Sequence, residues 1–125
     1  KLIGFGSMDV DNFEDRKIIL VSGIANPKPL SDFIRTKAEI LQHFNFNDHH
    51  KFRMGEIQEI HNIFDKFAAQ NPLILTTEKD AMRLMAKEFE SDIKKYPWFY
   101  QSIQVEIDRE EDFNKEIRRY VEENN

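Results

Sequence analysis

Residues 17–29 read K-I-I-L-V-S-G-I-A-N-P-K-P, and this stretch decides the fold class of the chain. The continuous, largely β-branched run Ile18-Ile19-Leu20-Val21 is typical of a strand that is covered on both faces. A turn-rich loop from Ser22 to Pro29 comes next, and its last proline suits the first turn of a helix. The stretch therefore predicts a buried strand, a loop and a helix in succession, which is the repeating unit of an α/β protein.

Strands and helices alternate along the rest of the chain. Apolar residues at helical spacing predict a helix that continues from residue 30 to residue 44 and another from residue 54 to residue 67. Apolar runs and alternation predict further strands at residues 44–46, 73–75 and 103–107, and further helices after residues 77 and 113. This order implies βαβ crossovers and hence a Rossmann-like, three-layer α/β/α sandwich with a small, mostly parallel sheet.

Length, charge and composition exclude several classes of protein. The 125 residues are enough for one domain, and the formal net charge of −5 argues against a nucleic-acid partner, which would need a basic face. The lack of cysteine rules out disulfides and thiolate metal sites. No stretch has the length of a membrane span or the form of a secretory signal. We expect a soluble, cytoplasmic domain, and the start at Lys1 without methionine suggests a piece of a longer protein.

Three polar segments come directly after the predicted strands, where open parallel sheets form their ligand sites. They are Gly23–Pro29, Asp48–His50 and Thr76–Asp80. Because the carboxyl ends of parallel strands lie along one edge, we expect these loops to lie close together. The glycine loop has the position of a phosphate loop but not the G-x-x-x-x-G-K-[ST] spacing, which no other segment supplies. The chain alone is therefore not a complete P-loop catalyst.

The segment Asp48-His49-His50 is the most chemically capable of the three. Histidine titrates near neutral pH and can exchange a proton with a carboxylate or orient it. The plain alternative is a solvated turn in which Asp48 caps the backbone of the next segment. A zinc site would need three or four converging ligands, and we interpret His43 as an exposed helix-end residue and His61 as a helix flank. We expect no metal ligands in this chain.

The segment Thr76-Thr77-Glu78-Lys79-Asp80 lies at the start of a predicted helix. Its hydroxyls, free amides and lysine would favour an anion. The spacing Thr77-x-x-Asp80 is also a variant of the capping box, and capping alone accounts for most of these residues.

The segment from Lys94 to Tyr100 combines lysines with aromatic residues. Such a cluster can contact a membrane interface. The simpler interpretation, which we favour, is a loop and the start of a strand packed into the core.

Taken together, the three loops resemble the successive C-terminal motifs of the tetraacyldisaccharide 4'-kinase family. The matching segments are V-S-G-I-A-N-P at residues 21–27, F-N-D-H-H at residues 46–50 and L-T-T-E-K-D-A at residues 75–81. Their order and spacing fit from about Lys17 to about Ile107. Two departures are Asn47, where many relatives carry proline, and the missing glycine at the end of the first helix.

The resemblance implies a lipid kinase. The whole enzyme would use ATP and Mg²⁺ to phosphorylate the 4'-hydroxyl of tetraacyldisaccharide 1-phosphate, forming lipid IVA in lipid A biosynthesis at the cytoplasmic face of the inner membrane of Gram-negative bacteria. Residues 17–125 would be its C-terminal α/β domain, an incomplete half of a P-loop kinase, and residues 1–16 a linker or N-terminal arm. The Walker A loop, the metal-binding acids and most lipid contacts would lie in an N-terminal domain. We therefore expect the fragment alone to bind neither ATP nor Mg²⁺ and to be inactive.

At the level of residues, the family pairs a histidine of the D-H-x motif with a catalytic aspartate of the N-terminal domain. By position this histidine is His49, with Asp48 and His50 as less favoured alternatives. Candidates for nucleotide contact are Lys79, Thr77 and Asn26.

Two hypotheses from other classes compete with this assignment. The first is a non-catalytic α/β binding or regulatory module, in which a change at His49 would alter melting rather than turnover. The second is a receiver-like phospho-acceptor domain, which needs clustered acids at strand ends. The acids Asp9, Asp11 and Asp48 fit that requirement poorly.

Overall fold

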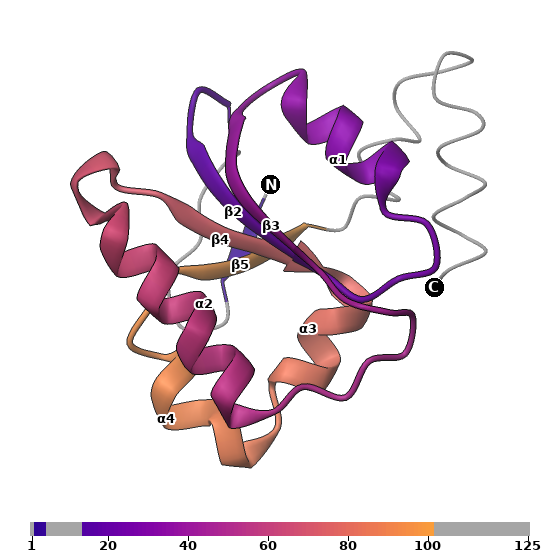
Figure 1. Ribbon diagram of the computed structural model, residues 1–125, viewed down its shortest axis with the longest axis vertical. Helices are drawn as coiled ribbons and strands as arrows, with labels where there is room; N and C mark the ends of the chain where they lie inside the picture. The colour runs from indigo at the N-terminus through magenta and orange to yellow at the C-terminus, as the bar shows by residue number, and fades with distance from the viewer. Residues whose placement is uncertain (1, 5–13, 102–125) are drawn as a thin grey trace.

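A single five-stranded sheet with the order β1-β5-β4-β2-β3 organises the molecule (Figure 1). The computed structural model describes residues 2–4 and 14–101. The strands are β1 (Leu2–Gly4), β2 (Lys17–Ser22), β3 (Glu39–Asn45), β4 (Leu73–Thr77) and β5 (Trp98–Gln101). The helices are α1 (Lys28–Arg35), α2 (Met54–Lys66), α3 (Glu78–Leu84) and α4 (Glu90–Ile93), with short 3₁₀ turns η1 (Ala68–Gln70) and η2 (Lys87–Phe89).

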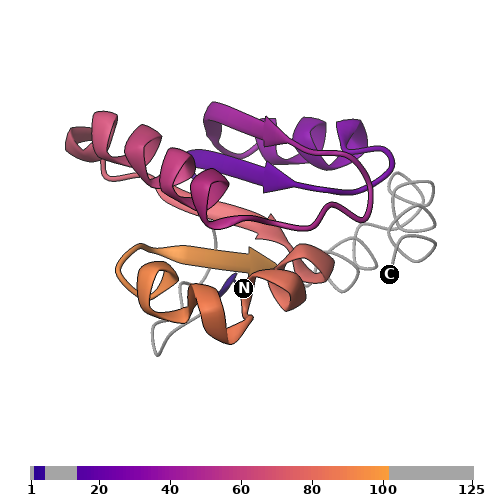
Figure 2. The same ribbon diagram turned by 60° about the horizontal axis from the view of Figure 1, so that its bottom comes forward.

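The pairing of the strands confirms a mostly parallel sheet. Strands β3, β2, β4 and β5 are parallel to one another, and only β1 runs antiparallel, beside β5. Residues 2–4 of the predicted arm thus add a strand to the sheet, while the division of the chain after residue 16 stays a prediction. In Figure 2 the four parallel strands lie one above another, and their arrowheads point to the same edge.

The central strand β2 separates two apolar cores. Side chains of Ile18 and Leu20 pack on one face with α1, and those of Ile19 and Val21 pack on the other. All four are fully buried, as predicted for a strand covered on both sides. Burying each such side chain stabilises the fold by about 1.5–3 kcal/mol.

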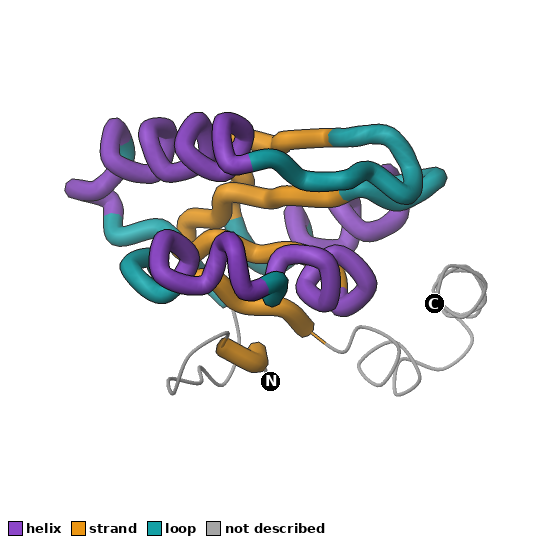
Figure 3. The backbone as a smooth tube through the Cα atoms, turned by 90° about the horizontal axis from the view of Figure 1, so that it is seen from below, coloured by secondary structure: helices purple, strands orange, loops and turns teal. Residues whose placement is uncertain are grey.

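The two cores confirm the three-layer α/β/α sandwich. Helix α1 covers one face, and α2, α3 and α4 cover the other, so that they lie in front of the sheet when the molecule is seen from below (Figure 3). Buried residues on the α1 side include Leu30, Phe33 and Ile34; on the opposite side they include Ile57, Ile60, Leu84, Ile93 and Trp98.

The predicted helix from residue 30 to residue 44 is wrong in its second half. Helix α1 ends at Arg35, where the Thr36 hydroxyl donates to the carbonyl of Phe33, and residues 39–45 form the edge strand β3. A bulge explains the misleading pattern: Ile18 pairs with Ile40, but Ile19 pairs with Gln42, so one extra residue interrupts the alternation. Because of the extra residue, apolar side chains in this strand no longer alternate strictly, and their spacing resembles that of a helix.

Several other predicted elements are confirmed by the structure. Strand β4 and helix α2 lie where they were predicted, and the short strand proposed at residues 44–46 is the end of the longer β3. Trp98 and Phe99 are buried in β5, which confirms that the segment from Lys94 to Tyr100 packs into the core. The strand and the helix predicted at residues 103–107 and after residue 113 lie outside the described residues.

His61 lies on the buried face of α2 and not on an exposed flank of the helix. Its Nε2 accepts a hydrogen bond of 2.9 Å from the indole N–H of Trp98, and its ring stacks on Tyr96 with 3.7 Å between centroids. Burial lowers the pKa of His61 from 6.5 to about 4, although Asp92 and Asp65 oppose the shift. The protein therefore folds around a neutral imidazole.

The buried imidazole makes stability depend on pH in a defined window. Below pH 6.5 the unfolded chain takes up a proton at His61, and the folded chain does not until about pH 4. The contribution of neutral His61 to the free energy of unfolding should therefore be fully present above pH 6.5. At pH 5 the free energy of unfolding should be lower by about 2 kcal/mol. Urea unfolding followed by the fluorescence of the single tryptophan measures it. His61→Gln keeps an acceptor for Trp98 without titrating, and an equal pH dependence in this variant would contradict the prediction.

Candidate functional site

The order of the strands places the topological switch point between the carboxyl ends of β2 and β4. The chain leaves β2 towards α1 on one face of the sheet and leaves β4 towards α3 on the other. Open α/β sheets bind ligands at such a switch point, because the two loops diverge there. The first and third of the predicted loops, at Gly23 and at Thr76–Asp80, lie at this switch point.

A buried carboxylate joins these two loops. Asp80 is fully buried, and its Oδ2 accepts hydrogen bonds from the Gly23 amide at 2.9 Å and from the Thr77 hydroxyl at 2.7 Å. Its other oxygen lies 3.1 Å from Nη1 of Arg83. The Asp80 amide in turn donates to the Thr77 hydroxyl at 3.0 Å, which confirms the predicted helix cap. The carboxylate, however, caps a donor on the neighbouring loop and not one on its own helix.

All three loops meet at Gly23. A Cβ atom on this residue would lie 3.1 Å from Oδ1 of Asp80, 3.3 Å from the Asn47 carbonyl and 3.4 Å from Cβ of His50. The amide of His49 donates to the Gly23 carbonyl at 3.3 Å, so the second loop also lies on this edge. The expectation that the three loops lie close together is therefore met.

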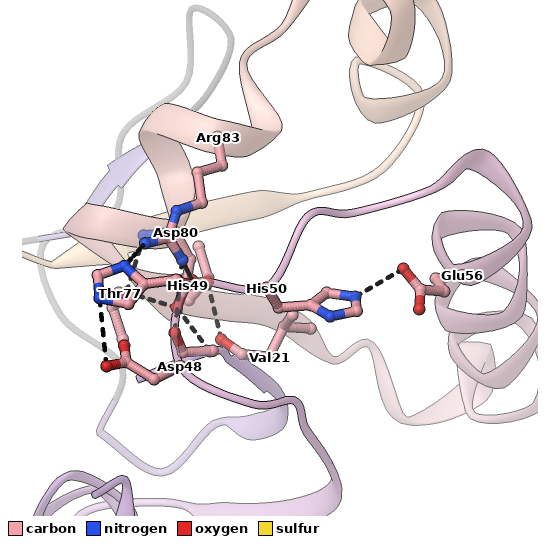
Figure 4. Close-up of polar contacts among 10 residues, drawn as sticks. Val21, Asp48, His49, His50, Glu56, Thr77, Asp80 and Arg83 are labelled. Atoms are coloured by element: carbon pink, nitrogen blue, oxygen red, sulfur yellow. Dashed lines mark hydrogen bonds and ion pairs between the residues drawn. The ribbon is translucent and has the colours of Figure 1, made fainter. Parts of the chain in front are cut away.

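His49 lies at the tip of the second loop with its ring in solvent. Its backbone φ is 62°, in the left-handed region that histidine tolerates better than most residues, and its side chain is 71% exposed. Nε2 lies 3.4 Å from Oδ2 of Asp48, and Nδ1 lies 3.3 Å from Nη2 of Arg83 (Figure 4). The imidazole thus has a polar neighbour at each nitrogen, while most of the side chain is exposed to solvent.

His50 points the opposite way, towards α2 (Figure 4). Its Nε2 lies 2.9 Å from Oε1 of Glu56, and its ring stacks on Phe46 with 4.4 Å between centroids. The same oxygen of Glu56 accepts the amide of Arg53 at the start of α2. His50 therefore packs the loop against the helix, and of the two adjacent histidines His49 is the one whose ring faces solvent.

The three candidates for nucleotide contact differ in their surroundings. The Thr77 hydroxyl both donates to the Asp80 carboxylate and accepts its amide, so it is already used inside the protein. Lys79 is half-buried at the first turn of α3, and Asn26 is exposed on the loop after β2. Their contact with a nucleotide stays a prediction.

His43 is not an exposed helix-end residue, because the segment is a strand. It is half-buried on β3, and its Nε2 lies 2.8 Å from Oγ of the buried Ser22. Burial, and to a lesser extent the charge of Arg35, lower the pKa of His43. The pair ties the edge strand to β2.

Arg83 is the site residue that sequence reasoning missed. Its guanidinium contacts Asp80, His49 and, at 3.4 Å, the carbonyl of Gly23, so it touches all three loops. The spacing of three residues from Asp80 on a predicted helix favours an ion pair, and this is the signal that the sequence offers for Arg83.

The described part of the chain offers no metal centre: within residues 2–4 and 14–101, no group of three or more His, Asp or Glu could hold an ion. Among the helices that the structure describes, none is long and apolar enough to cross a membrane.

Comparison with known proteins gives one consistent result. The sequence profile of the family "Tetraacyldisaccharide-1-P 4'-kinase" matches residues 3–122. The tetraacyldisaccharide 4'-kinases of Bacteroides thetaiotaomicron and Phocaeicola vulgatus are 38% and 34% identical, over 86% and 89% of this chain. That of Bacteroides fragilis is 34% identical over 88%. The chain spans 29–31% of the length of these relatives. No solved structure matches it significantly.

The contacts at Gly23 predict how the loops respond to one added methyl group. Gly23→Ala would push against Asp80 and the Asn47 carbonyl, so we expect a loss of about 1–3 kcal/mol in the free energy of unfolding. Gly55→Ala is the matched control, because nothing lies within 4 Å of its Cβ position in α2 and alanine favours helix. Chemical unfolding of both variants tests the prediction, and equal stability of Gly23→Ala and the unmodified chain would contradict it.

Proposed function

This chain belongs to the tetraacyldisaccharide 4'-kinase family, and from that membership we propose that it is the C-terminal domain of such an enzyme. The whole enzyme transfers the γ-phosphate of ATP to the 4'-hydroxyl of tetraacyldisaccharide 1-phosphate and forms lipid IVA. It acts with Mg²⁺ at the cytoplasmic face of the inner membrane. The phosphate loop, the metal ligands and most of the lipid site belong to an N-terminal P-loop domain, which this chain meets as its partner.

The described residues contain no group of three or more possible metal ligands, and the sequence has no phosphate-loop spacing. The proposed contribution of this chain is to present groups to a neighbouring domain. The edge formed by the three loops supplies such groups, and His49 is the most exposed titratable side chain among the contacts described there.

The proposed role of His49 is to support a catalytic aspartate of the N-terminal domain. Phosphoryl transfer depends on positioning and charge stabilisation more than on covalent help from the protein. An aspartate that accepts the proton of the sugar hydroxyl must point one oxygen at that hydroxyl, and an imidazole N–H on its other oxygen fixes this orientation. Because the imidazole comes from a second domain, domain closure would complete the site.

One observation supports the proposal most directly: in the second loop the side chain of His49 is exposed to solvent, whereas that of His50 packs against the protein. The ring of His49 lies at the tip of the loop in solvent, while His50 is bound to Glu56 and stacked on Phe46. His49 has a positive φ at this tip, and its side chain is 71% exposed.

Replacing His49 in the full-length enzyme tests the proposal. We choose His49→Asn, because asparagine tolerates a φ of 62° and alanine would add backbone strain. Turnover should fall by about 100-fold or more, since a supporting group for the general base is lost, while the melting temperature stays nearly unchanged.

The matched variant is His50→Gln, which removes the neighbouring imidazole. It should lower the melting temperature through the loss of its contacts with Phe46 and Glu56 and leave turnover of the folded enzyme close to normal. Wild-type turnover of His49→Asn would refute the catalytic role. A drop in its melting temperature without a drop in turnover would instead favour the non-catalytic binding or regulatory module.

A further inference from the structure

Arg83 is anchored more firmly than its position on a short helix would suggest. One nitrogen, Nη1, lies 3.1 Å from Oδ1 of the fully buried Asp80 and 3.4 Å from the carbonyl of Gly23. The other, Nη2, lies 3.3 Å from Nδ1 of His49. The side chain is 25% exposed. The guanidinium is planar, and its partners are a buried carboxylate and a backbone carbonyl. These two contacts orient the guanidinium independently of the imidazole.

The contact with Arg83 decides which nitrogen of His49 carries the proton. A guanidinium has only N–H donors and no acceptor, so the atom that it meets must accept. The neutral imidazole with its proton on Nε2 satisfies this condition at Nδ1. The opposite tautomer would place two N–H donors against each other at 3.3 Å.

The proton on Nε2 then faces Asp48. The distances from Nε2 to Oδ2 of Asp48, 3.4 Å, and from Nδ1 to Nη2 of Arg83, 3.3 Å, are both longer than the usual 2.7–3.2 Å of a hydrogen bond. The two partners differ in their anchoring, because Arg83 is held by the fully buried Asp80, whereas Asp48 lies on the exposed loop itself. Asp48 therefore holds this N–H weakly, and a better placed carboxylate can replace it at little cost. The geometry presents an N–H that is oriented and readily transferred to a new acceptor.

We propose that Arg83 is a positioning residue that holds His49 in the tautomer with its proton on Nε2, and that Asp48 is the interim acceptor of this N–H. The first half concerns this chain alone. The second half rests on the proposed function, since the final acceptor is the carboxylate of the N-terminal domain. The covalent N–H bond stays intact in this step. When the domains close, the N–H exchanges its hydrogen-bond acceptor from one carboxylate to another.

NMR of the 125-residue chain tests the tautomer directly. Long-range ¹H–¹⁵N correlations of the His49 ring should show protonation on Nε2 only. Free histidine already prefers this form, so the decisive comparison is Arg83→Met, in which a measurable fraction should carry the proton on Nδ1. Arg83→Lys keeps a donor and should restore the wild-type pattern. The ring of His50, bound to Glu56, serves as the internal control and should not change.

Kinetics of the full-length enzyme test the consequence for catalysis. Arg83→Met should lower kcat by about 10-fold with unchanged KM values, because the imidazole is present but less often correctly oriented. Arg83→Lys should recover part of the loss. Arg35→Met, on the exposed surface of α1, is the matched control and should leave kcat unchanged.

The two experiments separate this inference from the proposed function. Protonation on Nδ1 in the unmodified chain overturns the tautomer assignment, and identical His49 spectra in the unmodified chain and Arg83→Met overturn the positioning role of Arg83, whatever His49→Asn does to turnover. An altered tautomer in Arg83→Met together with an unchanged kcat overturns the catalytic half. If Arg83→Met does not fold, the unmodified chain still tests the assignment, because protonation on Nδ1 there overturns it.

Discussion

The carboxylate of Asp80 is buried away from water between two loops of the sheet edge, and this burial constrains everything around it. A buried carboxylate without partners costs several kcal/mol, so the folded chain must keep the donors that surround it. These donors are the amide of Gly23, the hydroxyl of Thr77 and the guanidinium of Arg83. The requirement thereby ties the loop after β2 to the start of α3 and orients the arginine.

The same constraint extends to the exposed part of the site. With Gly23 held by Asp80, its carbonyl receives the amide of His49, and the second loop must pass close to the first. The two imidazoles of this loop make different contacts. His50 binds Glu56 of α2, whereas His49 lies at the tip of the loop and contacts Arg83. A buried polar centre thus supports the exposed imidazole of His49, on which the proposed function depends.

The sequence predicts the centre of the fold well and its edge poorly, for physical reasons. The run Ile18–Val21 predicts a strand covered on both sides, and this strand separates the layers; β3 resembles a helix in sequence because one bulged residue disturbs its alternation. At the site, the three loops follow from strand order. Strand order does not predict the hydrogen bond from Gly23 to Asp80, nor which of the two adjacent histidines is exposed. The first depends on a tertiary contact, and the second depends on tertiary contacts and on the φ angle of His49.

Hydrogen exchange at the amide of Gly23 tests the central claim most directly, because that amide donates to the buried carboxylate of Asp80 on the neighbouring loop. We predict that it exchanges slowly in the unmodified chain, far more slowly than the amide of the exposed Ala25 two residues later, and that Asp80→Asn abolishes much of this protection. Exchange at Gly23 as fast as at Ala25 in the unmodified chain would show that the carboxylate does not hold the loops together and would contradict the central role of Asp80.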